Sequence, residues 1–352
     1  MEQCLELIDK LYSNANLTRE EIIFLIKNID ASSRDRLFFL ARKRAREAYG
    51  NEIYIRGLIE ISNICKNDCF YCGIRRSNKN AIRYRLTLEE IFSCCQKGFE
   101  LGFRTFVLQG GEDDYFSDLA LCKLIDRIKS SFPSCAVTLS LGEKTRESYE
   151  MLFNAGADRY LLRHESITKA HYEMLHPKNM SLQNRIRCLY DLKEIGFQVG
   201  CGFMVGAPFQ SVEDIARDLE FIKDFSPEMV GIGPFISHKS TPFSKWSNGS
   251  VELTILLLGI IRLLLPNVLL PATTALSTLD KNGQRDGFLA GANVVMPNLS
   301  PMNERKKYSL YDGKAFLGLE AGENLDKLKA LAREMGLEIA ISKGDFRKQK
   351  LN

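Results

Sequence analysis

The chain has 352 residues, of which 45% are hydrophobic and 26% are charged. These proportions are typical of a globular protein, and they exclude a disordered tail, a collagen-like fibre and a small disulfide-stapled domain. The 48 basic and 44 acidic side chains are scattered along the chain and give a net charge of +4. A charge that weak and diffuse does not indicate a nucleic-acid partner.

The sequence predicts neither export nor a membrane span. The N-terminus carries acidic residues and lacks a basic stretch followed by an apolar one, so we expect no signal peptide. The most apolar window, residues 254–266, is interrupted by Arg262 and ended by Pro266, whereas a bilayer span needs about 18 uninterrupted apolar residues. We therefore predict a core helix there and a cytoplasmic protein without a membrane partner. Its ten cysteines should be reduced thiols or metal ligands.

The first fifty residues are polar and have helical periodicity. Thr18, followed three positions later by Glu21, is typical of a helix start, because the two side chains can cap backbone N–H groups reciprocally. We predict an N-terminal helical extension over residues 1–50 and expect it to close one end of the domain that follows.

From residue 51 onward, short apolar or β-branched runs alternate with amphipathic stretches. The predicted strands are 55–61, 105–109, 136–140, 159–163, 198–204, 229–235, 268–272 and 293–296, and the helices between them include 87–101, 118–131, 182–195 and 212–224. This alternation indicates parallel strands covered by helices, and eight strands predict an α/β fold with a closed (β/α)8 TIM-type barrel over residues 51–315. A doubly wound open sheet is the alternative. Residues 316–352 are predicted to form a C-terminal helix (324–335) and a charged tail.

Three cysteines, Cys65, Cys69 and Cys72, lie within eight residues directly after the first predicted strand. A structural zinc site takes four protein ligands, often from two CxxC pairs, and the chain has no second pair. Three thiolates on one loop suit a [4Fe–4S] cluster whose fourth iron is free for another ligand. Incidental packing cysteines are the alternative. The other seven are predicted to be mostly core thiols: Cys4, Cys94, Cys95, Cys122, Cys135, Cys188 and Cys201.

The loops that follow barrel strands build the active site, at the C-terminal face. The second strand runs into Gln109-Gly110-Gly111-Glu112, where the glycines allow a close backbone approach and the carboxylate can bind an ammonium group. The other strand ends carry small, polar or apolar residues that are candidates for the active site: Thr138, Ser140, Met204, Ile232, Thr273 and Thr274.

The fourth predicted strand is the most informative, because alternation places Arg159, Leu161, Arg163 and Glu165 on one face. Both faces of a barrel strand are covered, so these charges are not simply solvated. They predict an anion-binding wall inside the barrel, with Glu165 near its rim. A structural layer of salt bridges is the alternative. His164 has the opposite parity and is predicted to be a packed histidine.

The CxxxCxxC spacing, with Phe70-Tyr71 between its last two cysteines, resembles the signature of the radical S-adenosylmethionine (SAM) superfamily. The resemblance implies that the open iron chelates SAM and that one-electron reduction cleaves SAM to a 5′-deoxyadenosyl radical. It also implies that the Gly110-Gly111-Glu112 motif holds the methionine amine.

Over residues 50–315 the chain resembles the group that contains biotin synthase, methylornithine synthase and the HydE maturases of [FeFe]-hydrogenase. The most specific likeness to the HydE family lies in the charged segment 156–165 and the double threonine of segment 271–275, with further matches at 54–57, 83–87, 108–113, 138–143, 229–236 and 291–298. The resemblance implies a role in building the di-iron subcluster. The implied substrate is an iron–carbonyl–cyanide–cysteine complex made by the maturase HydG, and the product that HydE makes from it passes towards the scaffold HydF. Reduced ferredoxin or flavodoxin is the implied electron donor.

The strand-end positions and the resemblance together imply two sets of residues beside the cluster ligands. SAM would be bound by Tyr71, Gly110, Gly111, Glu112, Ser140, Glu165, Arg185, Met204 and Ile232. The substrate would be bound by Arg56, Gln109, Thr138, Arg159, Arg163, Thr273, Thr274, Tyr308 and Tyr311. Arginines and hydroxyl donors in a closed barrel suit an anionic metal complex.

Three other functions compete with this interpretation. Methylornithine synthase would need acids paired with arginines for an amino-acid substrate, and biotin synthase would need a second cluster inside the barrel. A non-enzymatic metal-transfer module would need the cysteine triad but not the residues at the strand ends. Some HydE proteins carry a second cysteine triad near the C-terminus, but this chain has no cysteine after Cys201, so we predict a single [4Fe–4S] cluster.

Overall fold

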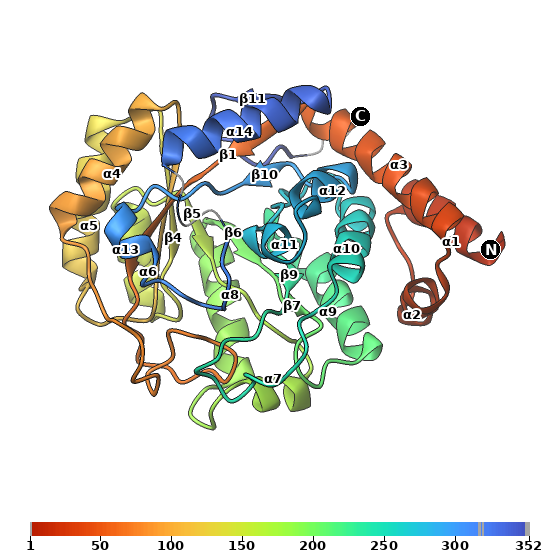
Figure 1. The fold of residues 1–352 in the computed structure, drawn as a ribbon, viewed down its shortest axis with the longest axis horizontal. Coiled ribbons are helices and arrows are strands. Elements are labelled where there is room, and N and C mark those ends of the chain that lie inside the picture. Colours follow the sequence, from red (N-terminus) through yellow and green to blue (C-terminus); the bar gives the residue numbers. More distant parts are fainter. Residues whose placement is uncertain (1, 316–317, 319, 349–352) are drawn as a thin grey trace.

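The computed structural model describes residues 2–315, 318 and 320–348. At its centre, six parallel strands are hydrogen-bonded side by side in chain order (Figure 1). They are β2 (Gly57–Ser62), β3 (Thr105–Gly110), β4 (Ala136–Ser140), β5 (Arg159–Leu161), β6 (Gln198–Cys201) and β8 (Met229–Val230).

The sheet closes on itself through isolated parallel bridges. Met229 of β8 pairs with Leu269, Pro271 pairs with Val294 of β10 (Val294–Val295), and Asn298 pairs with Leu58 of β2. The described residues thus form a ring of eight parallel segments, which confirms the TIM-type barrel and excludes the open sheet. The predicted strand 268–272 is present only as bridges, because Pro271 cannot donate a ladder hydrogen bond.

Several predicted strands are broken where the barrel wall bends. The first becomes β1 (Glu52–Ile55) and β2 with Arg56 between them, since β1 turns away to pair with β10 and β11 (Glu338–Ala340). The fifth and sixth continue as β7 (Met204–Val205) and β9 (Gly233–Pro234), which pair with each other. The break at Gly202 has φ +147°, and a Cβ there would lie 2.1 Å from the Gly231 carbonyl oxygen.

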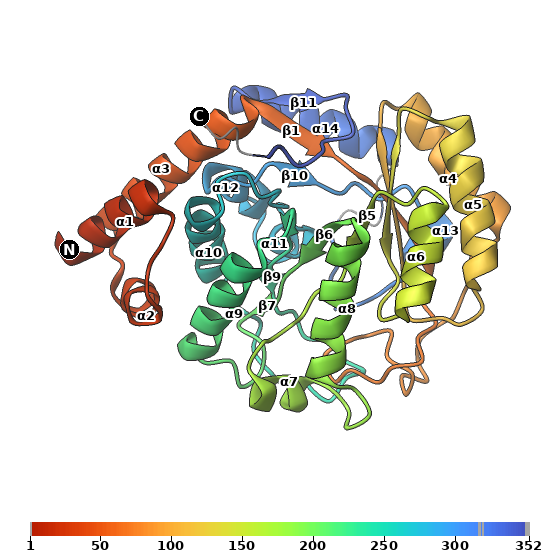
Figure 2. The same ribbon diagram turned by 180° about the vertical axis from the view of Figure 1, so that it is seen from behind.

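Helices cover the outside of the barrel, as Figures 1 and 2 show from opposite sides. They are α4 (Leu88–Glu100), α5 (Asp118–Ser131), α6 (Arg146–Asn154), α7 (Lys169–Leu175), α8 (Leu182–Ile195), α9 (Val212–Phe225), α10 (Val251–Leu264), α11 (Thr274–Leu279), α12 (Gly283–Leu289) and α13 (Met302–Arg305). The four predicted amphipathic helices match α4, α5, α8 and α9. The predicted core helix is α10, whose buried Arg262 donates hydrogen bonds to three backbone carbonyls.

The N-terminal extension consists of α1 (Glu2–Asn14), α2 (Arg19–Asn28) and α3 (Ala31–Tyr49). The predicted capping box is present, since the Thr18 hydroxyl accepts from the Glu21 N–H and the Glu21 carboxylate accepts from the Thr18 N–H. The expectation that these helices close one end of the barrel is wrong for most of their length. They lie along its side, α2 against α9 and α3 against α10, because α10 is apolar and needs covering.

The C-terminal segment closes the barrel instead. After α14 (Ala321–Glu334), β11 pairs in parallel with β1, and the following residues cross the N-terminal ends of the barrel strands. Along this path the Lys343 carbonyl accepts from Thr105, and Asp345 accepts from Gln198. We call residues 342–348 the floor segment. The predicted helix is present, but the following part of the predicted charged tail is an ordered strand and this floor segment.

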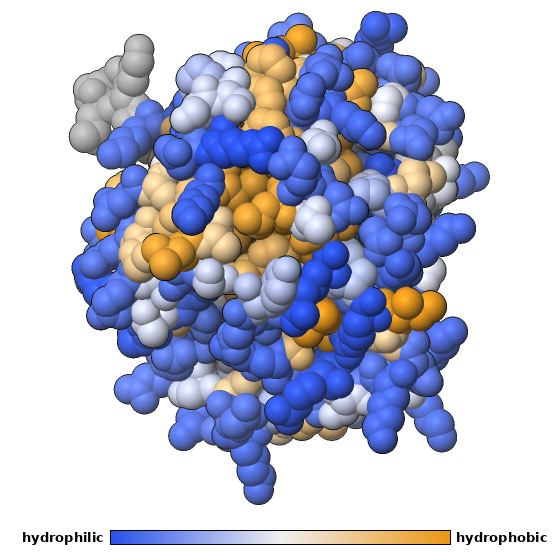
Figure 3. All heavy atoms as spheres, turned by 90° about the vertical axis from the view of Figure 1, so that its left-hand side faces the viewer, coloured by the Kyte–Doolittle hydropathy of each residue, from blue (hydrophilic) through white to orange (hydrophobic). Residues whose placement is uncertain are grey.

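Within the described part of the chain, no helix is both long and apolar enough to cross a membrane. The face covered by α4 and α5 is largely hydrophilic, with apolar side chains gathered near its upper middle (Figure 3). Nearly all of the buried apolar side chains form one continuous core between the barrel wall and its helices.

Candidate functional site

The cysteine loop follows β2 at the C-terminal end of the barrel, opposite the floor segment (Figures 1 and 2). It is fastened to the turn after β3, since the Lys66 N–H donates to the Glu112 carbonyl at 2.9 Å and the Glu112 N–H points at the Cys65 sulfur at 3.4 Å. A Cβ on Gly111 would lie 2.2 Å from the Ile64 carbonyl oxygen and 2.7 Å from the Cys65 Cβ. Glycine is therefore required where the two loops meet.

The three thiols of this loop are free and partly buried. Burial raises the pKa of all three, that of Cys72 to about 12, so cluster binding has to displace their protons. Among the described residues, no three His, Cys, Asp or Glu side chains already form a set that could hold a metal ion. The donor chemistry nevertheless fits a cluster with three thiolate ligands, because all three sulfurs lie on one loop at the active-site end of the barrel.

α7 and the turn after it support the cysteine loop from outside. The Phe70 N–H donates to the Leu175 carbonyl at 3.0 Å, and the Tyr71 hydroxyl lies 3.2 Å from His176 Nε2. His176 Nδ1 lies 2.8 Å from the Tyr172 carbonyl, so Nδ1 carries the proton and Nε2 accepts from Tyr71. Burial lowers the pKa of His176 to about 3, which keeps this arrangement neutral.

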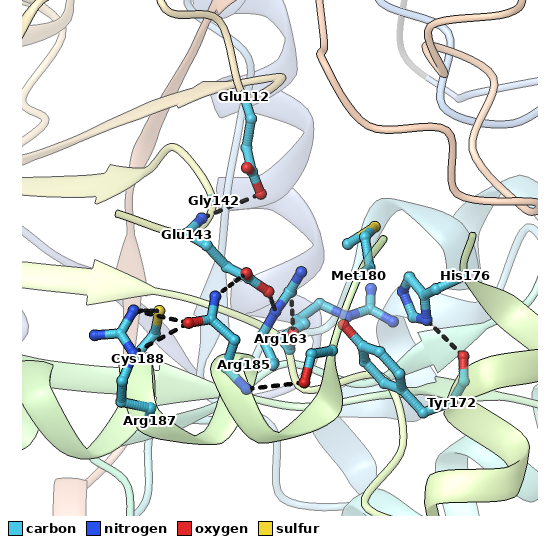
Figure 4. A network of polar contacts seen from close by, with 12 residues as sticks. Glu112, Gly142, Glu143, Arg163, Tyr172, His176, Met180, Arg185, Arg187 and Cys188 are labelled. Carbon is cyan, nitrogen blue, oxygen red and sulfur yellow. Dashed lines mark hydrogen bonds and ion pairs between the residues drawn. The ribbon is translucent and has the colours of Figure 1, made fainter. Parts of the chain in front are cut away.

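A network of charged groups connects the loops after β3, β4 and β5 (Figure 4). The Glu112 carboxylate accepts from the Glu143 N–H at 3.1 Å, and it fits there because Gly142 has φ +76° and no Cβ. Glu143 in turn forms an ion pair of 2.5 Å with Arg185, whose Nη1 donates to the Arg163 carbonyl. Burial alone would lower the pKa of Arg185, but Glu143 raises it well above its ordinary value.

Glu165 lies at the rim of the barrel beside this network. Its carboxylate accepts from Arg163 at 2.9 Å, and its backbone has φ +62°, a conformation that non-glycine residues rarely adopt. β5 ends at Leu161, so the predicted strand alternation does not extend to these two residues. His164 is fully buried, as predicted for a packed histidine, with Nε2 3.4 Å from Asp218.

Several predicted substrate residues carry buried polar atoms that have no hydrogen-bond partner. They are Arg56 Nε, Thr138 Oγ1, Arg163 Nε and Thr273 Oγ1. Arg56 is completely buried and forms no ion pair within the described chain. Its Nη1 lies 2.9 Å from the Met229 sulfur and its Nη2 lies 3.5 Å from the Gly344 carbonyl of the floor segment, so only Nε has no acceptor. Burial, and to a smaller extent repulsion from Arg159, lowers the pKa of Arg56 well below its ordinary value. Unpaired buried polar groups cost free energy, so a polar or anionic ligand inside the barrel would satisfy them.

Arg159 lies at the floor and already has protein partners. Its guanidinium forms an ion pair of 2.5 Å with Asp345 and donates to Thr105 Oγ1 and the Lys343 carbonyl. The sequence left two interpretations open for Arg159, an anion-binding site and a structural salt bridge. These contacts favour the structural salt bridge.

The remaining predicted residues fall into two groups. Gln109 donates to the Tyr308 hydroxyl at 3.3 Å, Met204 packs in a cluster with Tyr71, and Ser140 pairs with Gln109, all near the cysteine loop. Burial raises the pKa of Tyr311 to about 12, and the tyrosine lies near Arg163.

The second group lies away from the cysteine loop. Thr274 lines a surface pocket between β10 and α14, and the Ile232 side chain is buried in the main core.

Sequence reasoning missed three residues of this arrangement. Glu143 pairs with Arg185, His176 holds Tyr71, and Asp345 pairs with Arg159. Glu143 could have been proposed, since it directly follows Gly142 at a strand end. The other two partnerships join residues that are more than a hundred positions apart, and no local pattern indicates them.

The fold and the cysteine loop agree with comparisons to known proteins. The model of the radical SAM superfamily matches residues 59–222. The structure resembles that of methylornithine synthase with a TM-score of 0.81 and 24% identity, over 95% of this chain and 97% of the other. It also resembles the [FeFe]-hydrogenase maturase HydG of Carboxydothermus hydrogenoformans, with a TM-score of 0.80 and 22% identity, over 96% of this chain and 79% of the other. The class is that of the radical SAM enzymes, with a [4Fe–4S] cluster and SAM as cofactors.

Sequence comparison identifies the family within this class. The [FeFe] hydrogenase maturase subunit HydE of Thermotoga maritima is 43% identical over 309 residues, 88% of each chain. The 3-methylornithine synthase of Methanosarcina acetivorans is 26% identical over 86% of each chain. The chain belongs to the HydE family of [FeFe]-hydrogenase maturases.

Proposed function

We propose that this maturase acts on an iron–carbonyl–cyanide–cysteine complex during assembly of the [FeFe]-hydrogenase di-iron subcluster. When bound, the cluster and SAM supply a 5′-deoxyadenosyl radical. Cys65, Cys69 and Cys72 would hold the cluster. Glu112 would bind the methionine amine of SAM and Glu165 its ribose hydroxyls, with Arg185 keeping the surrounding loops in place through Glu143 and the Arg163 carbonyl.

The observation that carries the substrate proposal is the set of orphaned polar atoms inside the barrel. Arg56 is a fully buried cation that forms no ion pair in the described chain and whose Nε has no acceptor, and Thr138 and Thr273 carry hydroxyls without hydrogen-bond partners. An anionic complex with carbonyl, cyanide and carboxylate acceptors would satisfy all three residues. An amino-acid substrate such as lysine would instead bring its ammonium group towards a site rich in arginine, which favours the maturase over the methylornithine synthase alternative.

The test is an anaerobic hydrogenase maturation assay that lacks only the HydE component. Adding this protein should restore hydrogen production, and adding Cys69→Ala should not. The matched control is Cys122→Ala, a half-buried thiol on α5, which should restore activity fully.

A second measurement separates the two levels of the proposal. If SAM is converted to 5′-deoxyadenosine but no hydrogenase activity appears, the radical chemistry stands and the maturase substrate is wrong. Incubation with lysine then tests the methylornithine synthase alternative. Restoration by Cys69→Ala would indicate a function that does not need the cluster.

A further inference from the structure

A buried ion pair joins the loop that carries Tyr308 to the first strand of the barrel. The Lys314 ammonium pairs with the Glu60 carboxylate of β2, and the two side chains are 9% and 0% exposed. Glu60 is paired in register with Gln109 of β3, whose side chain donates to the Tyr308 hydroxyl, so Glu60 and Gln109 face the same side of the barrel wall. The pair therefore lies beside two of the predicted substrate residues, although no sequence pattern indicated a role for it.

Glu60 is also held by contacts that do not involve Lys314. Its Oε2 accepts from Asn298 Nδ2 at 2.8 Å, and its N–H donates to Ser300 Oγ at 2.8 Å. Asn298 Oδ1 accepts from the Ser300 N–H, which fixes the orientation of the amide. The Tyr84 hydroxyl donates to the Glu60 carbonyl at 2.7 Å. A carboxylate that is fully buried in a fixed position needs a cation beside it, and Lys314 supplies that cation.

Lys314 contacts Tyr308 as well as Glu60. The ammonium lies 3.4 Å from the Tyr308 carbonyl and 5.2 Å from the centre of its ring, within the range of a cation–π contact. Tyr308 is 2% exposed, and its hydroxyl accepts from Gln109 at 3.3 Å. The tyrosine is thus fixed at its carbonyl, its ring and its hydroxyl. Lys314 also lines the surface pocket that contains Thr274.

Further contacts fasten the same loop to the rim of the barrel. The Gly73 N–H of the cysteine loop donates to the Leu310 carbonyl at 2.8 Å. The Lys239 N–H, in the loop after β9, donates to the Asp312 carboxylate at 2.7 Å. These contacts hold the loop against its neighbours, whereas the ion pair connects it to a strand of the barrel beside Tyr308.

We propose that Glu60 and Lys314 are positioning residues, which set the place of Tyr308 against the substrate of the radical reaction. This inference rests on the proposed function, because Tyr308 is one of the residues predicted to bind its substrate. A buried ion pair adds little stability compared with uncharged side chains of similar size, because both charges lose their hydration. It favours one arrangement of the loop, since any other arrangement would leave a charge buried and unpaired.

The test removes both charges and keeps the volume of the pair. In Glu60→Gln/Lys314→Met, the glutamine can still accept from Asn298, and no charge is left buried. We expect the free energy of unfolding in urea to stay unchanged or to rise. Amide hydrogen exchange in residues 306–312, measured by mass spectrometry without ligand, should become about tenfold faster. Hydrogen production in the maturation assay should fall about tenfold or more, while SAM is cleaved as in the wild type.

The matched control is Lys307→Met on the same loop. Lys307 pairs with Glu304 and its side chain is 30% exposed, so exchange and maturation should stay at the wild-type level. A double variant that unfolds more easily, and whose maturation falls only in proportion to its folded fraction, would show that the pair is merely structural. Unchanged exchange in the loop, or faster exchange with full maturation, would also overturn the proposal.

The exchange measurement separates this proposal from the proposed function, because it needs neither substrate nor partner proteins. A wild-type protein that does not mature hydrogenase would disprove the proposed function. Slow exchange in that protein and fast exchange in the double variant would still show that the pair holds the loop.

Discussion

Arg159, the first residue of β5, forms an ion pair of 2.5 Å with Asp345, which lies 186 residues further along the chain. The arginine is 2% exposed at the floor of the barrel, and the carboxylate reaches it from the floor segment. The pair therefore fastens the C-terminus across the end of the barrel that lies opposite the cysteine loop. Asp345 gives Arg159 the negative charge that no residue of the neighbouring barrel strands supplies.

The first prediction concerns this pair. Asp345→Ala should lower the free energy of unfolding by about 1–3 kcal/mol, because a buried guanidinium loses its counter-charge. In a double-mutant cycle with Arg159→Met, the two substitutions should couple by about 1 kcal/mol or more, measured by urea unfolding. Asp326→Ala, whose side chain is 79% exposed, is the control and should have little effect. Additive effects of the two floor substitutions would show that the pair does not stabilise the protein.

The second prediction distinguishes Arg56 from Arg262, which is equally buried. Arg56→Met should leave the unfolding free energy unchanged or raised, since it removes a buried charge that has no ion-pair partner. Hydrogenase maturation should fall by at least about tenfold while SAM cleavage persists, because one contact to an anionic substrate is lost. Arg262→Met should do the reverse and destabilise the protein by about 2 kcal/mol or more, since three carbonyls lose their donor. A stable Arg56→Met protein with full maturation activity would remove Arg56 from the substrate site.

The third prediction concerns the number of clusters. Reconstituted wild-type protein should bind about four iron atoms per chain, as one [4Fe–4S] cluster requires. Cys69→Ala should lose this iron, whereas Cys122→Ala should keep it. About eight iron atoms with matching spectra would reveal a second cluster and contradict the prediction.

The fourth prediction tests the contact between the cysteine loop and the turn after β3. In Gly111→Ala, the added Cβ would overlap the Ile64 carbonyl and the Cys65 Cβ, so the loop must move. SAM binding, measured by equilibrium titration of the reconstituted protein, should weaken by about tenfold or more. Gly322→Ala on α14 is the control, because its Cβ would make an ordinary contact with Leu101. Wild-type affinity in Gly111→Ala would show that the loop tolerates the displacement.

Local sequence patterns were sufficient for much of the fold. The capping pair Thr18 and Glu21, the periodicity of α4 and α9 and the alternation of strand with helix all follow from interactions within a few residues. The barrel follows from them because parallel strands need helices to connect and cover them. The positions of Cys65, Cys69 and Cys72 after the first barrel strand also place the cluster loop at the active-site end without any knowledge of tertiary structure.

Only the tertiary structure decided which buried charges are paired. The resemblance implied both Arg56 and Arg159 as substrate residues, but in the structure Arg159 forms an ion pair with Asp345 of the floor segment, whereas Arg56 receives only the Gly344 carbonyl of that segment and no ion pair. The pairing of Arg185 with Glu143 and the support of Tyr71 by His176 are likewise contacts between distant segments. The energy of a buried charge depends on its nearest neighbours in space. In this barrel those neighbours come from segments far apart in the sequence, so a local sequence pattern cannot reveal them.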